Sequence, residues 1–112
     1  MNTYFISMEN AVIEQCPGHI SYELLTEKNG CVNGCCCGIS RYTTTEYAKP
    51  GCHADQEGFF VLSGSGSAKV GDCETEIYPG LSFVAPAGVP HAIRSNDEAV
   101  PVEVFWFHAA IF

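Results

Sequence analysis

Basic side chains are scarce in this chain. Its 112 residues include 5 Lys and Arg against 13 Asp and Glu, for a formal net charge of −8. Nothing in such a chain neutralises the phosphates of nucleic acid, so we expect no nucleic-acid partner. An anionic membrane surface is excluded for the same reason. The charge favours solubility instead.

Long apolar runs and export signals are also missing. A membrane-spanning helix needs roughly 18 or more consecutive apolar residues, and the sequence has no such run, so no membrane association is expected. Residues 1–10 have neither a basic start nor a long apolar centre, and we therefore expect no signal peptide. The length predicts one domain over residues 1–112.

Cysteine is abundant, but regular cysteine spacing is lacking. The number of cysteines is odd and three are adjacent, which suits no disulfide framework and favours reduced thiols in a cytoplasmic protein. Zinc sites commonly pair two C-x2-C units, whereas Cys31 and the run at 35–37 offer only other spacings and no second pair. We expect small apolar filler there, with the role of these four thiols left open. The seven are Cys16, Cys31, Cys35, Cys36, Cys37, Cys52 and Cys73.

Helical periodicity is almost absent, and short strands separated by turns take its place. Residues 5–15 fit either a short helix or an edge strand. The remaining strands are expected at residues 20–26, 36–47, 59–62, 65–70, 74–78, 81–85, 91–94 and 102–107. This spacing is typical of an all-β sandwich or small barrel. The last strand is apolar on both faces, so a second copy covering one face, a homodimer, is expected.

The most informative stretch is residues 80–91, G-L-S-F-V-A-P-A-G-V-P-H. Proline fixes φ and glycine permits positive φ, so the turn at Pro86, Gly88 and Pro90 has little freedom. His91 follows this turn directly and is held by the scaffold. A second histidine, His53, lies four residues before Glu57, and imidazole with carboxylate suits Zn²⁺, Fe²⁺, Mn²⁺ or Ni²⁺.

Together these two segments resemble the cupin family over residues 39–107. The family's second motif, G-x5-P-x-G-x2-H-x3-N, is matched at Gly80, Pro86, Gly88 and His91, and departs only at its last position, where Ser95 stands and Asn96 comes one residue late. The latter half of the first motif, H-x3-E-x6-G, is matched by His53, Glu57 and Gly64.

One ligand position of the first motif is not matched. The family's first histidine falls on Gly51, or on Pro50 and Cys52 with the longer spacer, so the usual set of three histidines and one glutamate is incomplete. The resemblance implies a jelly-roll barrel, also called a double-stranded β-helix. It also implies a divalent metal (Fe, Mn, Zn or Ni) held by His53, Glu57 and His91.

Two kinds of function follow from the resemblance. One is a metal-dependent enzyme of dioxygenase, isomerase or decarboxylase type acting on a small organic molecule. The other is a non-catalytic module that binds or senses a sugar or a carboxylate without a metal, which the missing histidine favours. Tyr42, Arg41 and Arg94 are candidates for contact with the small molecule. The fold alone does not decide between these two kinds of function.

Overall fold

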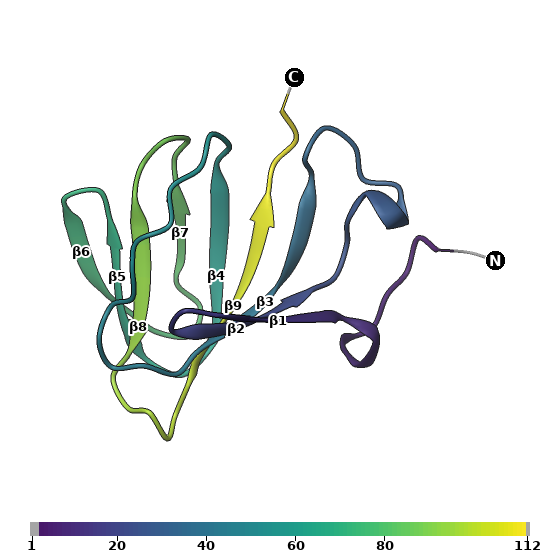
Figure 1. Ribbon diagram of the computed structural model, residues 1–112. Helices are drawn as coiled ribbons and strands as arrows, with labels where there is room; N and C mark the ends of the chain where they lie inside the picture. Colours follow the sequence, from purple (N-terminus) through teal and green to yellow (C-terminus); the bar gives the residue numbers. More distant parts are fainter. Residues whose placement is uncertain (1–2, 112) are drawn as a thin grey trace.

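Nine antiparallel strands and two 3-10 turns make up residues 3–111, which this computed structural model describes (Figure 1). Residues 1, 2 and 112, although part of the predicted domain, lie outside this range. The bounds are η1 Met8–Asn10, β1 Val12–Cys16, β2 His19–Glu23, η2 Glu27–Asn29, β3 Cys36–Tyr42, β4 Glu57–Ser63, β5 Gly66–Val70, β6 Cys73–Ile77, β7 Ser82–Ala85, β8 His91–Ser95 and β9 Val102–His108.

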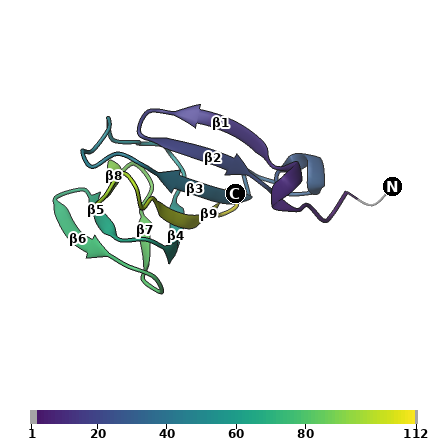
Figure 2. The ribbon, with the colours of Figure 1, turned by 90° about the horizontal axis from the view of Figure 1, so that it is seen from below.

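The strands form two sheets that face each other. The larger has the order β1-β2-β3-β9-β4-β7 and the smaller the order β6-β5-β8. Figures 1 and 2 show the small sheet lying beside the β4 and β7 end of the large one, with the hairpin of β1 and β2 extending the opposite edge. Every pairing is antiparallel. The all-β jelly-roll prediction is confirmed.

The predicted strands are found, with three adjustments. The strand expected over 20–26 is β2 and ends at Glu23. Residues 5–15, left open between helix and strand, contain both the turn η1 and the edge strand β1. The strand expected over 36–47 ends at Tyr42, because the following segment crosses to the small sheet. There Thr44 O accepts a hydrogen bond from Ser95 N, and Gly51 forms a β-bridge with His91.

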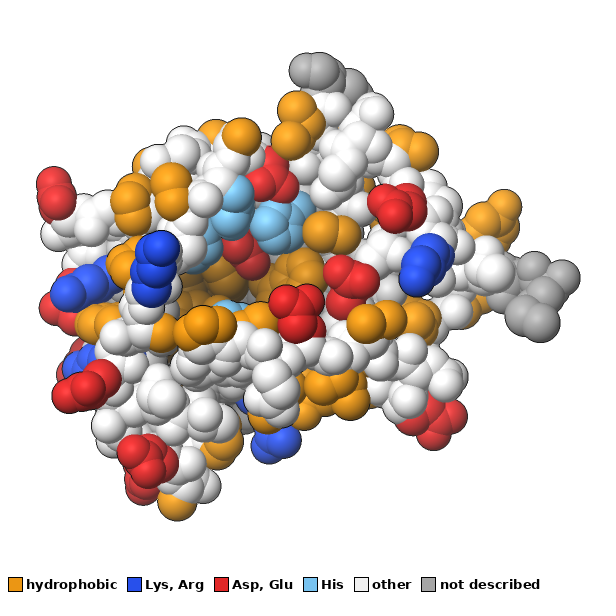
Figure 3. Space-filling model, in the orientation of Figure 1, with side chains coloured by type: hydrophobic (Ala, Val, Ile, Leu, Met, Phe, Trp, Pro, Cys, Tyr) orange, Lys and Arg blue, Asp and Glu red, His pale blue; other side chains and the backbone are white. Residues whose placement is uncertain are grey.

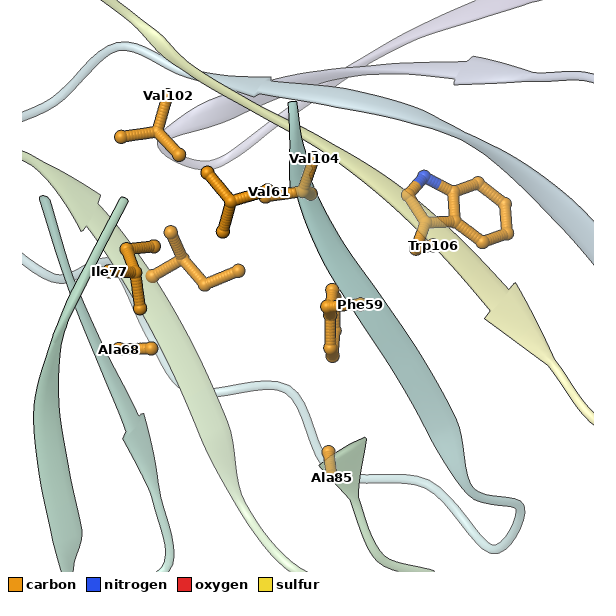
Figure 4. Close-up of a cluster of buried hydrophobic side chains, with 9 residues drawn as sticks. Phe59, Val61, Ala68, Ile77, Ala85, Val102, Val104 and Trp106 are labelled. Atoms are coloured by element: carbon orange, nitrogen blue, oxygen red, sulfur yellow. The ribbon is translucent and has the colours of Figure 1, made fainter. Parts of the chain in front are cut away.

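The core lies between the two sheets. Side chains of a strand alternate between its faces, and the inward set is apolar. The buried apolar residues are Phe59, Val61, Ala68, Ile77, Ala85, Ile93, Val102, Val104 and Trp106, most of them labelled in Figure 4. By the same alternation Glu57 shares a face with Phe59, and His108 shares one with Trp106. Polar groups therefore project inward at one end of the barrel, where β4 begins and β9 ends.

No helix among the described residues is long and apolar enough to cross a membrane.

Candidate metal centre

Backbone hydrogen bonds tie the loop before β4 to the turn before β8. Gly88 adopts a φ of 76°, and its N–H donates to the carbonyl oxygen of His53 at 2.8 Å. Gly51 and His91 exchange two hydrogen bonds, at 2.8 and 2.9 Å. The stiff turn expected from the sequence thus fixes His91, at the first position of β8, and holds the backbone of His53 beside it.

Glu57 lies at the centre of a cluster of polar side chains at this end of the barrel. Its Oε1 is 3.1 Å from Nε2 of His53 and 3.3 Å from Nε2 of His91. The Glu57 side chain is only 12% exposed. The structure therefore brings together the three residues that the sequence singled out, with the carboxylate between the two imidazoles.

A fourth residue, His108, completes the cluster and was missed from the sequence. Its Nε2 is 3.6 Å from Oε2 of Glu57. One ligand atom each from His53, Glu57 and His108 lie within 4.8 Å of one another, and this compact trio contains His108 rather than His91. The signal that could have found it is strand alternation, because His108 follows inward-facing Trp106 by two residues.

Asp55 holds the far side of two of these imidazoles. Its Oδ1 is 2.8 Å from Nδ1 of His53, and its Oδ2 is 2.6 Å from Nδ1 of His108. A ring nitrogen facing a carboxylate carries a proton, so each Nδ1–H donates to Asp55. The Nε2 atoms are then the ring nitrogens that face Glu57 and that a metal ion could take as ligands. Such a carboxylate behind a ligating histidine is a common feature of metal sites.

These contacts also shift the pKa values. Burial raises the pKa of Glu57, but hydrogen bonds from His108 and His91 outweigh it and lower the value to about 2. The hydrogen bond to Glu57 raises the pKa of His108 to about 8, against the opposing effect of burial. The same kind of bond raises the pKa of His91. The protonated imidazole of His108 thus offsets the charge of the carboxylate where a cation is not bound.

The donor set fits a divalent transition metal. Zn–N and Zn–O bonds are about 2.0–2.2 Å long, so donors around one ion lie roughly 3–4 Å apart. The separations of 3.1–3.6 Å between Glu57 oxygens and the three Nε2 atoms match that spacing. Imidazole and carboxylate together suit Zn, Fe, Mn and Ni. Gly51 supplies no ligand, and a Cβ at this position would lie 3.4 Å from Nε2 of His91.

The cluster lies in the wall of a cavity of about 510 Å³. Figure 3 shows the pale blue histidines gathered in a hollow, with acidic side chains among them. Tyr42 lines this cavity, as expected for a residue that contacts a small molecule. Arg41 instead pairs with Glu103 at 2.9 Å, and Arg94 lies over the ring of Tyr47, so neither is among the residues that line this cavity.

The cysteines lie outside the cluster. Cys52, beside His53, is exposed and directs its thiol to the carbonyl oxygen of Gly88 at 3.4 Å. All seven thiols are free. Burial is the largest of the effects that raise the pKa of Cys36 to about 11, so this thiol is protonated and a poor nucleophile or ligand.

Comparison with known proteins agrees with the jelly-roll fold described above. A family model described as "Cupin domain" matches residues 39–108, well over half of the chain. No curated protein sequence matches. Among solved structures, Fe(II) HppE is 18% identical with a TM-score of 0.78, and the match covers 94% of this chain but only 59% of HppE.

Two further structures are similar at the level of the fold. The Cnp3 cupin domain of Schizosaccharomyces pombe is 14% identical with a TM-score of 0.77, covering 96% of this chain and 74% of that one. The polyketide cyclase RemF of Streptomyces resistomycificus is 17% identical with a TM-score of 0.75, covering 93% and 77%. At such identities the likeness concerns the fold alone.

Proposed function

Because the chain belongs to the cupin family, we propose that it binds a divalent metal through His53, Glu57, His91 and His108 and a small organic molecule in the cavity beside it. The observation that carries this proposal is the convergence of three Nε2 atoms on one buried carboxylate. The contribution of His108 from β9 offsets the histidine that the first motif lacks at Gly51.

The bound metal would act as a Lewis acid on an oxygen of the small molecule, the role common to isomerase-type and dioxygenase-type chemistry. The protein's part is to hold the donors and exclude bulk water, which the buried Glu57 and the Asp55 hydrogen bonds support. Iron is the metal of Fe(II) HppE, and Fe²⁺ is therefore the first candidate here, ahead of Mn²⁺, Zn²⁺ and Ni²⁺.

The charges of the cavity wall weigh against the metal-free alternative, a module for a carboxylate. Lys49 is the one Lys or Arg among the residues that line the cavity, and in the metal-free form protonated His108 adds a second positive charge. Glu14, Glu57 and Asp55 oppose these two charges. A carboxylate placed there would face Glu57 without an excess of positive charge, unless a metal ion supplied it. A metal-loaded site is therefore the form we propose.

Metal content after chelation and reloading tests the proposal. We expect about one Fe²⁺, Mn²⁺ or Zn²⁺ per chain by elemental analysis, and a large loss in Glu57→Ala and in His108→Ala. His19→Ala is the matched control, because this histidine lines the same cavity but is not among the ion-pair partners of Glu57. Full metal retention by both Glu57→Ala and His108→Ala would refute the site, and failure of the wild-type protein to take up any of the metals would refute the function.

We also propose that a second copy covers the outer face of the large sheet. Phe60, Leu62, Val84 and Phe107 are all 43–49% exposed on neighbouring strands β4, β7 and β9. Gly58 lies between Val84 and Phe107 in the registers of these strands, so the patch is continuous. Contiguous apolar patches of this kind mark interfaces.

The cytoplasm is the compartment we propose, and the seven free thiols support it. Titration of the denatured protein, purified without reductant under nitrogen, should count seven thiols per chain. A count of five or fewer would indicate disulfides and contradict this assignment.

A further inference from the structure

All four histidines of the chain line one cavity, but only three of them contact Glu57. The fourth, His19, stands at the first position of β2, where it pairs with Tyr42 of β3. The two rings are stacked, with centroids 4.6 Å apart and planes inclined by 24°. His19 is therefore held rigidly in the cavity wall by a neighbouring ring, and the metal cluster does not account for it.

The tautomer of His19 follows from its one hydrogen bond. Nδ1 lies 3.3 Å from the carbonyl oxygen of Pro17, and a nitrogen that faces a carbonyl must carry the hydrogen. The other nitrogen, Nε2, is then an acceptor, and within residues 3–111 it has no hydrogen-bond partner. Burial also lowers the pKa of His19, which keeps the ring neutral despite Glu57 and Glu14. A fixed acceptor thus stands in the wall, ready for a donor from outside the chain.

The other residues of the cavity wall indicate what kind of molecule would bring the hydrogen-bond donor. Tyr42, stacked on His19, and Trp106 add aromatic surface to the same cavity, and Ala48 and Ile93 add aliphatic surface. The volume of about 510 Å³ lies within the usual range for sites of small organic molecules. Aromatic walls bind flat rings well, because offset stacking and edge contacts add to the burial of area.

We propose that His19 and Tyr42 form the organic-ligand subsite of this cavity, and that its ligand is a neutral, planar phenol-type molecule whose hydroxyl donates to Nε2 of His19. The inference deepens the proposed function, since the same cavity holds the metal cluster. Tyr42 is a positioning residue here, because it orients the imidazole by stacking.

A pair of probes separates the hydroxyl from the ring. 4-Methylphenol has the donor, whereas 4-methylanisole has the same ring with the hydroxyl methylated. We expect 4-methylphenol to bind the zinc-loaded protein about 10-fold more tightly by calorimetry, the gain from one buried hydrogen bond. It should also move the Nε2 resonance of His19 in nitrogen-detected imidazole spectra. Equal affinity for the two probes, or no binding of 4-methylphenol at millimolar concentration, would overturn the inference.

His19→Phe is the informative variant, because it keeps a flat ring on Tyr42 but removes the acceptor. Its affinity for 4-methylphenol should fall about 10-fold, to that of 4-methylanisole, while its zinc content stays at the wild-type level. Glu76→Gln, at an exposed position of β6 that does not line the cavity, should bind both probes as the wild type does. Unchanged binding of 4-methylphenol by a folded His19→Phe protein would contradict the proposal. If that variant does not fold, the imidazole spectrum of the wild type decides.

The same titrations on metal-free protein distinguish the two proposals. If zinc is not taken up but 4-methylphenol still moves the His19 resonance and outbinds 4-methylanisole, the subsite stands and the metal site fails. If zinc binds stoichiometrically and the two probes bind equally, the metal site stands and the subsite fails.

Discussion

Asp55 is the residue on which the geometry of two proposed metal ligands depends. Its carboxylate accepts from Nδ1 of both His53 and His108, at 2.8 and 2.6 Å, and so sets the tautomer and orientation of both rings. We expect Asp55→Ala to weaken metal binding by roughly 10–100-fold, the usual cost of losing such a partner, without abolishing it. Competition with a chromophoric chelator measures the change.

The matched control for Asp55 is Asp72→Ala, in the exposed turn between β5 and β6. That variant should bind metal as the wild type does. Wild-type affinity in Asp55→Ala as well would mean that the histidines are oriented by packing alone.

Charge at the metal-free cluster makes stability depend on pH. The pKa of His108 is raised from 6.5 to about 8, so its contribution is complete below pH 6.5 and is lost as the pH rises through 8. The pKa of Glu57 is lowered to about 2, so its contribution is complete above 4.5 and is lost as the pH falls toward 2. In chelator, the free energy of unfolding should be highest between these limits.

Urea unfolding between pH 5 and 9 measures the alkaline limb of this profile, the decrease in the free energy of unfolding as the pH rises. We expect a decrease of about 2 kcal/mol, which corresponds to the change in the pKa of His108 from 6.5 to about 8. His108→Ala should flatten this limb. With metal present the limb should disappear, because metal affinity increases as the ligands lose their protons. A flat profile for the metal-free wild type would show that His108 does not pair with Glu57 in solution.

His53, Glu57 and His91 could be predicted from the sequence, whereas His108 and Asp55 could not. The first three lie in short local patterns with fixed spacing, at a stiff turn and at the start of an apolar strand. His108 reaches Glu57 only because β9 pairs with β4, an arrangement of segments about fifty residues apart. Asp55 looks like any acidic loop residue until His108 is beside it.

At the scale of elements, turn residues were the most reliable signal for where strands end. Glycines with positive φ, such as Gly71 and Gly80, follow the ends of β5 and β6 closely, and the predicted strands end within a residue or two of them. The expected strand over 36–47 was too long, because its polar second half reads as strand locally. Residues 43–47 leave the large sheet because they form tertiary hydrogen bonds to β8, and these outweigh the local strand preference.

Ser95, at the end of β8, marks the departure from the family's second motif and holds the next loop. Its fully buried Oγ lies 2.7 Å from Asp97 O and 3.0 Å from Val100 O, and it accepts a hydrogen bond from Asp97 N at 3.1 Å. Removing this hydroxyl takes away the hydrogen bonds of Asp97 N and Val100 O to the side chain, whereas Asp97 O keeps Val100 N as a donor. Ser95→Ala should therefore lower the free energy of unfolding by about 1–3 kcal/mol, the value of two such hydrogen bonds.

Chemical denaturation compares Ser95→Ala with Ser63→Ala, whose side chain is exposed at the end of β4 and whose loss should cost less than about 0.5 kcal/mol. Metal content should be unchanged in both, because Ser95 acts on the loop and not on the cluster. Equal stability of the two variants would show that water replaces the Ser95 hydrogen bonds.

For the whole molecule, the proposed metal site and the exposed apolar patch lie on opposite faces of the same strands. β4 directs Glu57 and Phe59 inward and Phe60 outward, and β9 directs Trp106 inward and Phe107 outward. A partner on the outer face would therefore stiffen the strands that carry Glu57 and His108 without blocking the cavity. This separation of faces makes dimer formation and metal binding compatible.

Light scattering after size exclusion tests the dimer, with a mass near twice the 12.1 kDa of one chain expected for the wild type. Phe60→Lys places a charge in the centre of the patch, where burying it unpaired costs several kcal/mol, so this variant should elute as a monomer. Tyr78→Lys, at a residue 54% exposed beyond the end of β6, is the matched control and should remain dimeric. A wild-type mass of one chain at micromolar concentration would refute the dimer. A dimer that survives Phe60→Lys would place its interface elsewhere, with the edge strand β1 as the next surface to test.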